Sequence, residues 1–427
     1  MIADADVRTA SFWAVAPWYS RAPFAIMRGD KNTAPTGAGG SVRDVFIAGA
    51  GQTPVTKDHG GRGRYLGAAA VQAAVADAGI ASAAVGALFV GNMLSGILAN
   101  QQQLGGLIAD YSGLAGIEAV TIEAACASGG AAARMAYLAV AGGIHDVVAV
   151  CGVERMTHVE RDTVTRALAT AADWELEGVC GESFLSLNAG LMRAYMDKYG
   201  VAAERFAPFA INAHRNAQSN PNALLHKSLD LDTYRASRLV ADPIRLFDVS
   251  PICNGAAALV FVAPHLAAKA HARIRIAGSA IATAPVALSR RADVLQLTAV
   301  ESSTQRALRQ AGVAHADIDL FEPHDAYTIM TALTLEAAGF AAPGAGLDWA
   351  HEERIGLRGD LPLTTFGGLK ARGHPVGASG CYQLVEAFLQ LGERAAENQV
   401  PNAGVALVQN IGGTGATVAT HVLIRDA

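Results

Sequence analysis

The chain has 427 residues, 51% hydrophobic and 17% charged, with 45 glycines, five scattered cysteines and a formal net charge of −5. This composition excludes a disordered or fibrous chain. The negative net charge, without a Lys/Arg run, disfavours nucleic-acid binding. No apolar run approaches the roughly 20 residues of a membrane span. The cysteines form no CxxC pair, so the sequence suggests neither a disulfide framework nor a zinc site. We therefore expect a globular protein of the reducing cytoplasm that holds no metal.

Residues 1–41 differ in character from the rest of the chain. They contain an apolar piece at residues 10–18, but Asp4 and Asp6 precede it, which is a poor match to the basic start of a secretory signal. Residues 33–40, with one proline and three glycines, are typical of a linker. We expect a flexible N-terminal extension, either a functional arm or an overlong gene start.

An internal repeat organises the remainder of the chain. Residues 72–80 and 305–313 lie 233 positions apart, place alanine and aliphatic side chains at helical spacing, and each leads into an apolar strand. Further along, a Ser-Gly pair begins a helix at Ser128 and another at Ser379, and each helix precedes a second apolar strand. Matches in the same order indicate a duplication into two α/β halves.

Strands that are apolar throughout, such as residues 147–150 and 257–262, predict sheets covered by helices on both faces. The more polar region 157–246 is expected to be an insertion on the first half that carries substrate contacts. We therefore divide the chain after the extension into a first half, 42–275, and a second half, 276–427.

Cys126 lies where an apolar strand meets the start of an alanine-rich helix. Unpaired N–H groups and the positive end of the helix dipole favour a thiolate there, and the same N–H groups would stabilise an oxyanion on an attacked carbonyl. Cys126 is therefore a candidate nucleophile. The alternative is a small buried structural cysteine, an interpretation that fits the other four cysteines better.

His374 lies in a glycine-dense segment that leads into the helix at Ser379, and Pro375 constrains its backbone to an extended form. If Ser379 and Ser128 begin equivalent helices of the two halves, His374 and Cys126 approach one shared site. His374 is then a candidate base, with a helix-capping histidine as the alternative.

His324 follows the predicted strand at residues 318–321, where catalytic groups collect in open α/β sheets. It is a candidate donor to a thioester oxygen, or else a satisfied polar residue at a strand end, and Asp325 is expected to orient the loop or the ring. Asn410 and Gly412 lie in a glycine-rich connection after the strand 405–408. Backbone N–H groups there would form a second oxyanion hole, although a hairpin alone would explain the glycines.

From residue 42 to residue 424 these motifs together resemble the thiolase superfamily. The Cys126 segment is similar to the family's nucleophile motif, the Gly-His-Pro around His374 to its catalytic histidine motif, and His324 to Tyr327 to its oxyanion-histidine motif. The sequence around His374 and Asn410 most resembles that of archaeal-type acetyl-CoA acetyltransferases and sterol-carrier-protein-type thiolases. The resemblance implies a five-layer αβαβα fold of two pseudo-symmetric halves, assembled as dimers or tetramers.

The resemblance also implies the activity of an acyl-CoA acyltransferase. Cys126, deprotonated by His374, would attack an acyl-CoA thioester, while N–H groups of Cys126 and of a glycine near Gly412 hold the oxyanion. His324 and His374 would then polarise a second acyl-CoA, whose enolate attacks the acyl-cysteine. Coenzyme A thioesters are the implied substrates, and no bound cofactor is expected.

Two positions depart from the family pattern. The second cysteine of typical thiolases matches Asn410 here, and the one of sterol-carrier-protein-type enzymes matches Ala326. The usual acceptor for the α-proton of the nucleophilic acyl-CoA is therefore missing. Archaeal-type members share this absence and are thought to work with 3-hydroxy-3-methylglutaryl-CoA synthase and a small zinc-containing OB-fold protein, so such a partner is expected.

Three other functions stay open. A decarboxylating ketosynthase uses a Cys-His-His set and needs no proton-abstracting cysteine. A retro-aldolase of steroid side chains is suggested by Tyr327. A non-catalytic scaffold subunit would bind acyl-CoA and retain Cys126 without turnover.

Overall fold

The computed structural model describes residues 42–58, 61–267 and 273–426, so the expected N-terminal extension, residues 1–41, lies outside the described residues. Within these three ranges, no helix combines the length and the apolar character needed to cross a lipid bilayer.

The first half builds five strands in the order β3-β2-β4-β7-β1. The elements of this half are β1 (Phe46–Gln52), α1 (Gly63–Asp77), β2 (Ala87–Gly91), α2 (Ser95–Leu98), α3 (Leu104–Tyr111), β3 (Glu118–Ile122), α4 (Ser128–Ala141), β4 (Val147–Glu154), β7 (Gly255–Val262) and α9 (Pro264–Ala267). β2 pairs in parallel with β3 and β4, whereas β7 pairs antiparallel with β4 and β1. Every residue of β4 and β7 is buried, which confirms that helices cover both faces of this sheet.

The second half repeats this pairing. Its elements are β8 (Ile274–Thr283), α10 (Thr298–Ala311), β9 (Leu320–Glu322), α11 (Thr328–Ala337), α12 (Gly346–His351), a π-helix (Gly368–Arg372), α13 (Ser379–Leu391), β10 (Val405–Gly412) and β11 (Thr417–Arg425). β11 is antiparallel to β8 and β10, and β10 is parallel to β9, with a single parallel bridge from Phe321 to Leu363 in the place of a fifth strand. Since α10 precedes β9 as α1 precedes β2, and α13 precedes β10 as α4 precedes β4, the predicted duplication is confirmed.

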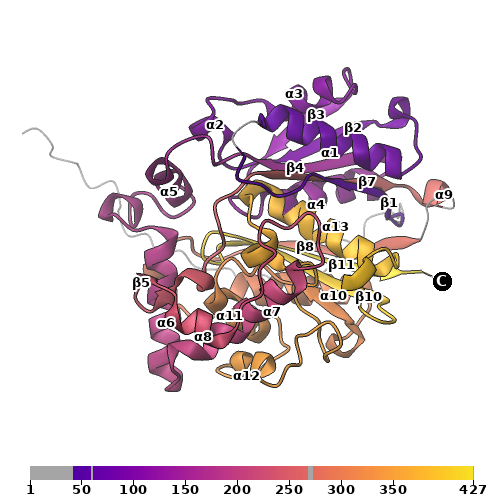
Figure 1. The fold of residues 1–427 in the computed structure, drawn as a ribbon. Coiled ribbons are helices and arrows are strands. Elements are labelled where there is room, and N and C mark those ends of the chain that lie inside the picture. Colours follow the sequence, from indigo (N-terminus) through magenta and orange to yellow (C-terminus); the bar gives the residue numbers. More distant parts are fainter. Residues whose placement is uncertain (1–41, 59–60, 268–272, 427) are drawn as a thin grey trace, which may run out of the picture. The chain divides into compact units, whose positions relative to one another are not determined.

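The two sheets are joined at one edge and enclose a layer of helices. Only two residue pairs, Phe46 with Arg275 and Ile47 with Ile274, connect β1 to β8. α4 and α13 contact strands of both halves, so they lie between the sheets, as Figure 1 shows for the yellow α13. α1 and α3 cover the outer face of the first sheet, and α10 and α11 cover that of the second. The layers follow the predicted order αβαβα.

The region between β4 and β7 forms a mainly helical insertion. Its elements are α5 (Arg161–Ala169), α6 (Phe184–Tyr199), α7 (Ala207–Ala217), α8 (Leu231–Ala236), β5 (Leu239–Ala241) and β6 (Ile244–Arg245). α6 and α7 pack against α11, so this part of the first half in sequence lies beside the second half in space (Figure 1). The limits proposed from the sequence, with a division between residues 275 and 276 at the beginning of β8, stay a prediction.

One element differs from the sequence interpretation at a position that concerns the site. β10 was expected to end at residue 408, but it continues to Gly412 because Asn410 and Ala419 face each other across the β10–β11 ladder. The placement of Asn410 in the connecting loop is therefore wrong. A strand residue has a fixed direction, and the side chain of Asn410 is consequently held in one place.

Candidate active site

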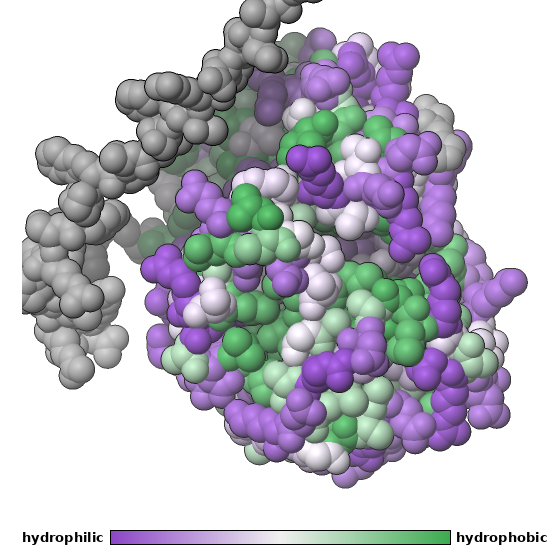
Figure 2. Space-filling model, turned by 90° about the vertical axis from the view of Figure 1, so that its left-hand side faces the viewer, coloured by the Kyte–Doolittle hydropathy of each residue, from purple (hydrophilic) through white to green (hydrophobic). Residues whose placement is uncertain are grey.

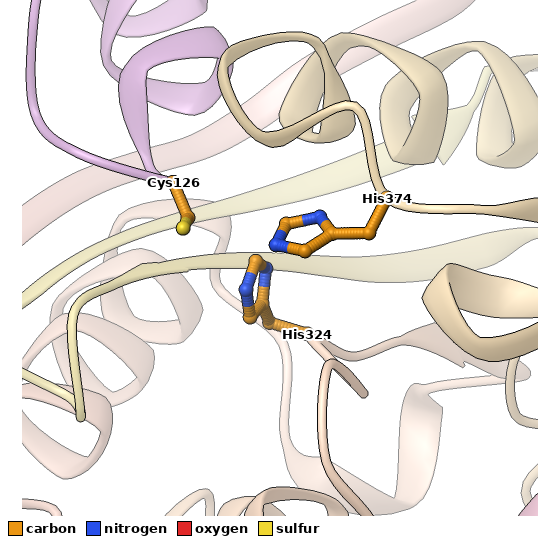
Figure 3. Close-up of side chains that lie close together, drawn as sticks. All are labelled: Cys126, His324 and His374. Atoms are coloured by element: carbon orange, nitrogen blue, oxygen red, sulfur yellow. The ribbon is translucent and has the colours of Figure 1, made fainter. Parts of the chain in front are cut away.

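Three buried side chains from distant parts of the sequence meet between the two halves. Cys126 Sγ, one ring nitrogen of His324 and one of His374 all lie within 4.8 Å of one another, and Figure 3 shows the three side chains pointing toward a common point. The two imidazole centroids lie 4.9 Å apart with their planes at 82°. The structure thus brings together the three residues that sequence reasoning selected separately.

A strained turn between β3 and α4 presents Cys126. Ala125 has a φ of +53°, in the left-handed region that costs energy for a residue with a side chain. Ser128 closes the turn, because its Oγ accepts a hydrogen bond from the N–H of Ala124 at 2.9 Å and donates to the carbonyl oxygen of Ala125 at 2.5 Å. The turn sets Cys126 just ahead of α4, which begins at Ser128.

Burial opposes the thiolate that the helix start was expected to favour at Cys126. Burial raises the pKa of Cys126 to about 12, and the charge of Glu154 adds to this, while the N–H groups of Gly413 and of Cys126 itself lower it. The N–H groups at the start of α4 are already engaged, since that of Ser128 donates to the Ala125 carbonyl and that of Gly130 to Asn410 Oδ1. Desolvation exceeds the contribution of these two N–H groups, so Cys126 needs a base to become a nucleophile.

The glycine turn after β10 supplies an N–H group to the sulfur. This N–H belongs to Gly413, one residue beyond the predicted Gly412. Gly412 is needed for space, because a Cβ there would lie 2.4 Å from the carbonyl oxygen of Ala124. The N–H groups of Gly413 and Cys126 therefore form the pair of donors that an oxyanion beside the sulfur requires.

The hydrogen bonds of His374 leave a lone pair facing the site. The Ser379 hydroxyl donates to the carbonyl oxygen of Pro375 at 3.3 Å, so its oxygen accepts from His374 Nδ1–H at 2.7 Å. The hydrogen of the neutral ring is then on Nδ1, and Nε2 carries the lone pair. Burial lowers the pKa of His374 well below its usual value, as do the charges of His324, Arg372 and Lys370. His374 is a neutral base.

His324 has the opposite tautomer. The N–H of Gly130 donates to Asn410 Oδ1 at 3.0 Å, which orients the amide so that Nδ2 donates to His324 Nδ1 at 3.1 Å. Nδ1 therefore carries no hydrogen, and Nε2–H faces the site as a donor. Burial lowers the pKa of His324 to about 3, with further contributions from Lys370 and Arg372. Asn410 thus contacts the site through its side chain, and its backbone faces Ala419 across the β10–β11 ladder.

A buried lysine ties the two histidine segments together. Lys370, in the π-helix that precedes His374, donates a hydrogen bond from Nζ to the carbonyl oxygen of Asp325. In return, Asp325 Oδ1 accepts from the N–H of Leu369 at 2.6 Å. Asp325 was expected to orient the His324 loop, and the contacts show that it also fixes the segment that carries His374.

Two residues near Cys126 were missed or underestimated from the sequence. Glu154, at the end of β4, accepts hydrogen bonds from the Asn92 side chain and from the N–H groups of Met93, Leu94 and Gly377. Burial raises its pKa to about 7. An acid that ends an otherwise apolar strand was the signal present in the sequence. Burial, and then the charge of Cys126, raise the pKa of Tyr327, so its phenol is also near the thiol.

A cysteine with two histidines at this separation also has the composition of a zinc site. The Asn410 amide opposes coordination by His324, because a metal needs a lone pair on the ring nitrogen that here carries the hydrogen. The arrangement instead provides a thiol, a base and a hydrogen-bond donor, which is the set that acyl transfer to sulfur requires.

Comparisons with known proteins agree with this chemistry. Residues 45–265 match the model of the thiolase N-terminal domain, and residues 280–425 match that of the thiolase C-terminal domain-like family. An acetyl-CoA acetyltransferase of Methanothermobacter thermautotrophicus is 38% identical over 385 residues, which cover 90% of this chain and 100% of the relative. Sterol carrier protein 2 of Bos taurus is 29% identical, over 88% of this chain and 71% of that protein. The solved Ltp2-ChsH2(DUF35) aldolase has the same fold, with a TM-score of 0.79 and 24% identity over 90% of this chain and 98% of that one.

Proposed function

The chain belongs to the thiolase family, and on that premise we propose that it is an acyl-CoA acyltransferase, an acetyl-CoA C-acetyltransferase or 3-ketoacyl-CoA thiolase, that stores the acyl group on Cys126. The observation that carries the proposal is the meeting of a buried thiol with two imidazoles of opposite tautomer within 4.8 Å. The acetyl-CoA acetyltransferase of M. thermautotrophicus supports coenzyme A thioesters as substrates.

In the first half-reaction, His374 Nε2 removes the proton of Cys126 as Sγ attacks the thioester carbonyl. The N–H groups of Gly413 and Cys126 hold the negative oxygen of the tetrahedral intermediate. The intermediate collapses by breaking the carbon–sulfur bond to coenzyme A, and the imidazolium of His374 returns its proton to the leaving thiolate. The products are acyl-Cys126 and free coenzyme A, and His374 is again neutral.

In the second half-reaction, a second acyl-CoA places its thioester oxygen at His324 Nε2–H, which stabilises the enolate that forms on loss of the α-proton. Neither Asn410 nor Ala326 has a basic side chain at neutral pH. His374 Nε2, free after the first half-reaction, is the base that accepts the α-proton. The enolate carbon then attacks acyl-Cys126, and the proton on His374 passes to the released Cys126 sulfur.

Intact-mass spectrometry after mixing with acetyl-CoA tests the acyl-enzyme. We expect a gain of one acetyl group that is lost in Cys126→Ala and retained in Cys180→Ala, which removes an exposed free cysteine. An adduct that persists in Cys126→Ala, or no adduct in the unchanged protein, would contradict the proposal. The second outcome would favour a scaffold subunit that binds acyl-CoA without turnover.

The absence of a second cysteine specifically favours one alternative. A decarboxylating ketosynthase generates its enolate by loss of carbon dioxide, so Asn410 and Ala326 would leave it complete. Thiolytic cleavage of acetoacetyl-CoA, compared with condensation that depends on malonyl-CoA, separates the two enzymes. We expect cleavage of acetoacetyl-CoA and no requirement for malonyl-CoA.

Partners are proposed on two grounds. Among the described residues β3 is an edge strand of the sheet, and pairing with the β3 of a second copy would form a homodimer. A small zinc-containing OB-fold protein is the second partner, supported by the solved neighbour, in which Ltp2 is joined to the DUF35 protein ChsH2. Figure 2 shows apolar patches on the face that carries α5, α6 and β5, and Trp174, Leu176 and Val179 are exposed in that region. We place the enzyme in the cytoplasm.

A further inference from the structure

A cavity of about 230 Å³ lies in the first half, bounded by the start of α1, the segment from α2 to α3, and the end of β4. Arg62 and Ala99 are exposed at one end of it, whereas Asn92, Val153 and Glu154 are buried at the other. The cavity therefore runs from the surface toward the residue that accepts the N–H of Gly377, close to His374. None of the steps proposed for acyl transfer uses it.

Positive charge dominates the lining. Three arginines, Arg62, Arg64 and Arg155, line the cavity together with one acidic residue, Glu154. Among the described residues, Arg62 and Arg64 make no ion pair with a carboxylate, and Arg64 is held by hydrogen bonds of 3.4 Å to Tyr111 and Gln101 and by the Tyr111 ring, whose centroid lies 5.4 Å from its guanidinium carbon. Burial, and then the charge of Arg62, lower the pKa of Arg155, so the two guanidinium groups are near enough to repel each other.

Glu154 does little to neutralise these arginines. Both of its oxygens already accept hydrogen bonds, Oε1 from Asn92 and Leu94 and Oε2 from Met93 and Gly377. Its charge is thereby directed at the backbone of the site and away from the arginines. A bound anion would stabilise the guanidinium groups that line this cavity.

The start of α1 adds donors to the same cavity. Arg62 is the N-cap of this 15-residue helix, no side chain caps it, and its first turn has no acidic residue. Gly63 and Arg64, whose N–H groups belong to this uncapped turn, line the cavity. Ser95 and Gln101 are further polar residues of the lining.

We propose that this cavity binds one anionic group, a carboxylate or a phosphate, through Arg62, Arg64 and Arg155. Its volume is below the roughly 300–1,000 Å³ of pockets that enclose whole drug-sized molecules. It therefore suits one charged group with a few attached atoms and excludes a whole coenzyme. Arginine forks match the geometry of both anions.

The anion has three possible sources, two of which rest on the proposed function. The group is the distal carboxylate of a dicarboxylic acyl-CoA, a phosphate of the coenzyme A moiety, or a free anion that acts as an effector. Binding itself can be measured without any chemistry at Cys126, so failure of the acyltransferase proposal and failure of this one are distinguishable.

Calorimetric titration of the full chain with sodium phosphate and with sodium succinate, at constant ionic strength, tests the site. We expect one site per chain, and at least about tenfold weaker binding in Arg62→Gln/Arg64→Gln. Arg161→Gln/Arg166→Gln removes the same two charges on α5, outside the cavity, and should bind within about twofold of the unchanged protein. Equal affinity in all three proteins overturns the proposal.

Analytical ultracentrifugation of the same variants tests whether the arginines instead form an interface between two copies of the chain. If Arg62→Gln/Arg64→Gln changes the oligomeric state and no anion binds the unchanged protein, a second copy covers the cavity and the proposal is wrong. A folded variant of unchanged mass with weakened anion binding supports it. Arg155→Gln then provides an independent change on the other wall of the cavity.

Acylation of Cys126 identifies the source once binding is established. A carboxylate on the acyl chain predicts that the double variant lowers the rate with succinyl-CoA at least about tenfold relative to butyryl-CoA. A coenzyme phosphate predicts the same loss with acetyl-CoA but not with its 3′-dephospho analogue. Weakened phosphate binding with no change in any acylation rate assigns the site to a free anion.

Discussion

Asn410 determines which ring nitrogen of His324 carries the hydrogen in the proposed reaction centre. Its amide joins the start of α4 to His324, and its orientation follows from the Gly130 N–H that it accepts. Ser379 has the corresponding role for His374. Two neutral imidazoles in one cavity thereby differ in function, one as a donor and the other as a base, although burial lowers the pKa of both.

Replacing Asn410 with leucine should expose this role. His324 then loses the donor to Nδ1, its hydrogen is free to move to Nδ1, and the donor to the thioester oxygen is lost. We expect kcat for acetoacetyl-CoA cleavage to fall about 10²- to 10³-fold, the usual effect of removing one oxyanion donor. Acetylation of Cys126 in single-turnover mass measurements should fall much less, because His374 and Gly413 are unchanged.

Asn216→Leu is the matched control for Asn410→Leu. Asn216 is also buried, and its amide donates to the carbonyl oxygens of Leu363 and Thr364 instead of to an imidazole. Both variants should lose about 1–3 kcal/mol of stability from buried groups left without partners. An equal loss of kcat in the two variants would show that Asn410 has a structural role alone.

The neutral state of the Cys126 thiol has a pH signature. Alkylation proceeds through the thiolate, and with a pKa raised to about 12 the thiolate fraction still rises about tenfold per pH unit at pH 9. The rate of iodoacetamide labelling at Cys126, followed by intact mass in a Cys180→Ser background, should therefore rise about 100-fold from pH 7 to 9. A rate that levels off near neutral pH would mean that the dipole of α4 outweighs burial after all.

At the scale of elements, the starts of α4 and α13 touch, and the site depends on that contact. A Cβ at Gly380 would lie 2.3 Å from both Asn410 Oδ1 and the backbone nitrogen of Gly130, and one at Gly129 would lie 2.9 Å from the nitrogen of Cys381. These glycines let the two helices approach until Gly130 and Asn410 can form their hydrogen bond. The helix–helix contact and the His324 tautomer therefore both require that Gly129 and Gly380 have no side chain.

Gly380→Ala should separate the two helices. We expect a loss of about 1–3 kcal/mol in the free energy of unfolding from overpacking, measured by urea denaturation, and a fall in kcat because Asn410 is displaced. Gly190→Ala in α6 is the control, since a Cβ there meets nothing within 4 Å. It should leave kcat unchanged and stabilise the protein by up to about 1 kcal/mol, as expected when alanine replaces glycine inside a helix.

At the scale of the whole molecule, β3 is an edge strand whose side chains are largely exposed. An exposed edge invites pairing with a second copy unless it is protected. Val120, at the middle of β3, is 41% exposed despite being apolar. The turn that carries Cys126 follows directly after β3, so assembly through this edge would also hold the nucleophile.

Val120→Glu should weaken this association. Two glutamates brought together across a twofold axis would repel and would lose their hydration, so we expect a dimer dissociation constant raised at least about tenfold. Analytical ultracentrifugation measures the change. Val42→Glu, at a position 72% exposed and outside the sheet, should leave the mass unaltered. A monomer in the unchanged protein, or a dimer unaffected by Val120→Glu, would refute pairing through β3.

The sequence by itself determined the duplication and the layered fold, and it selected the three side chains that the structure brings together. The helical spacing around Gln72 and Gln305, the apolar strands, the Cys-Ala-Ser-Gly-Gly segment at Cys126 and the glycine-dense segment at His374 are all local patterns. Local patterns can be recognised from the sequence alone. The repeat alone was enough to predict that Cys126 and His374 approach each other, because equivalent helices of two halves share one interface.

Only the tertiary structure decided how these side chains behave. The pKa of Cys126, the tautomers of the two imidazoles and the choice of Gly413 over Gly412 depend on burial and on hydrogen bonds between distant segments, such as Gly130 with Asn410. Desolvation and hydrogen-bond direction are properties of the packed site. A sequence pattern does not report burial or hydrogen-bond direction. For that reason, the sequence around Cys126 favours a thiolate at the helix start, whereas burial in the packed site favours a neutral thiol.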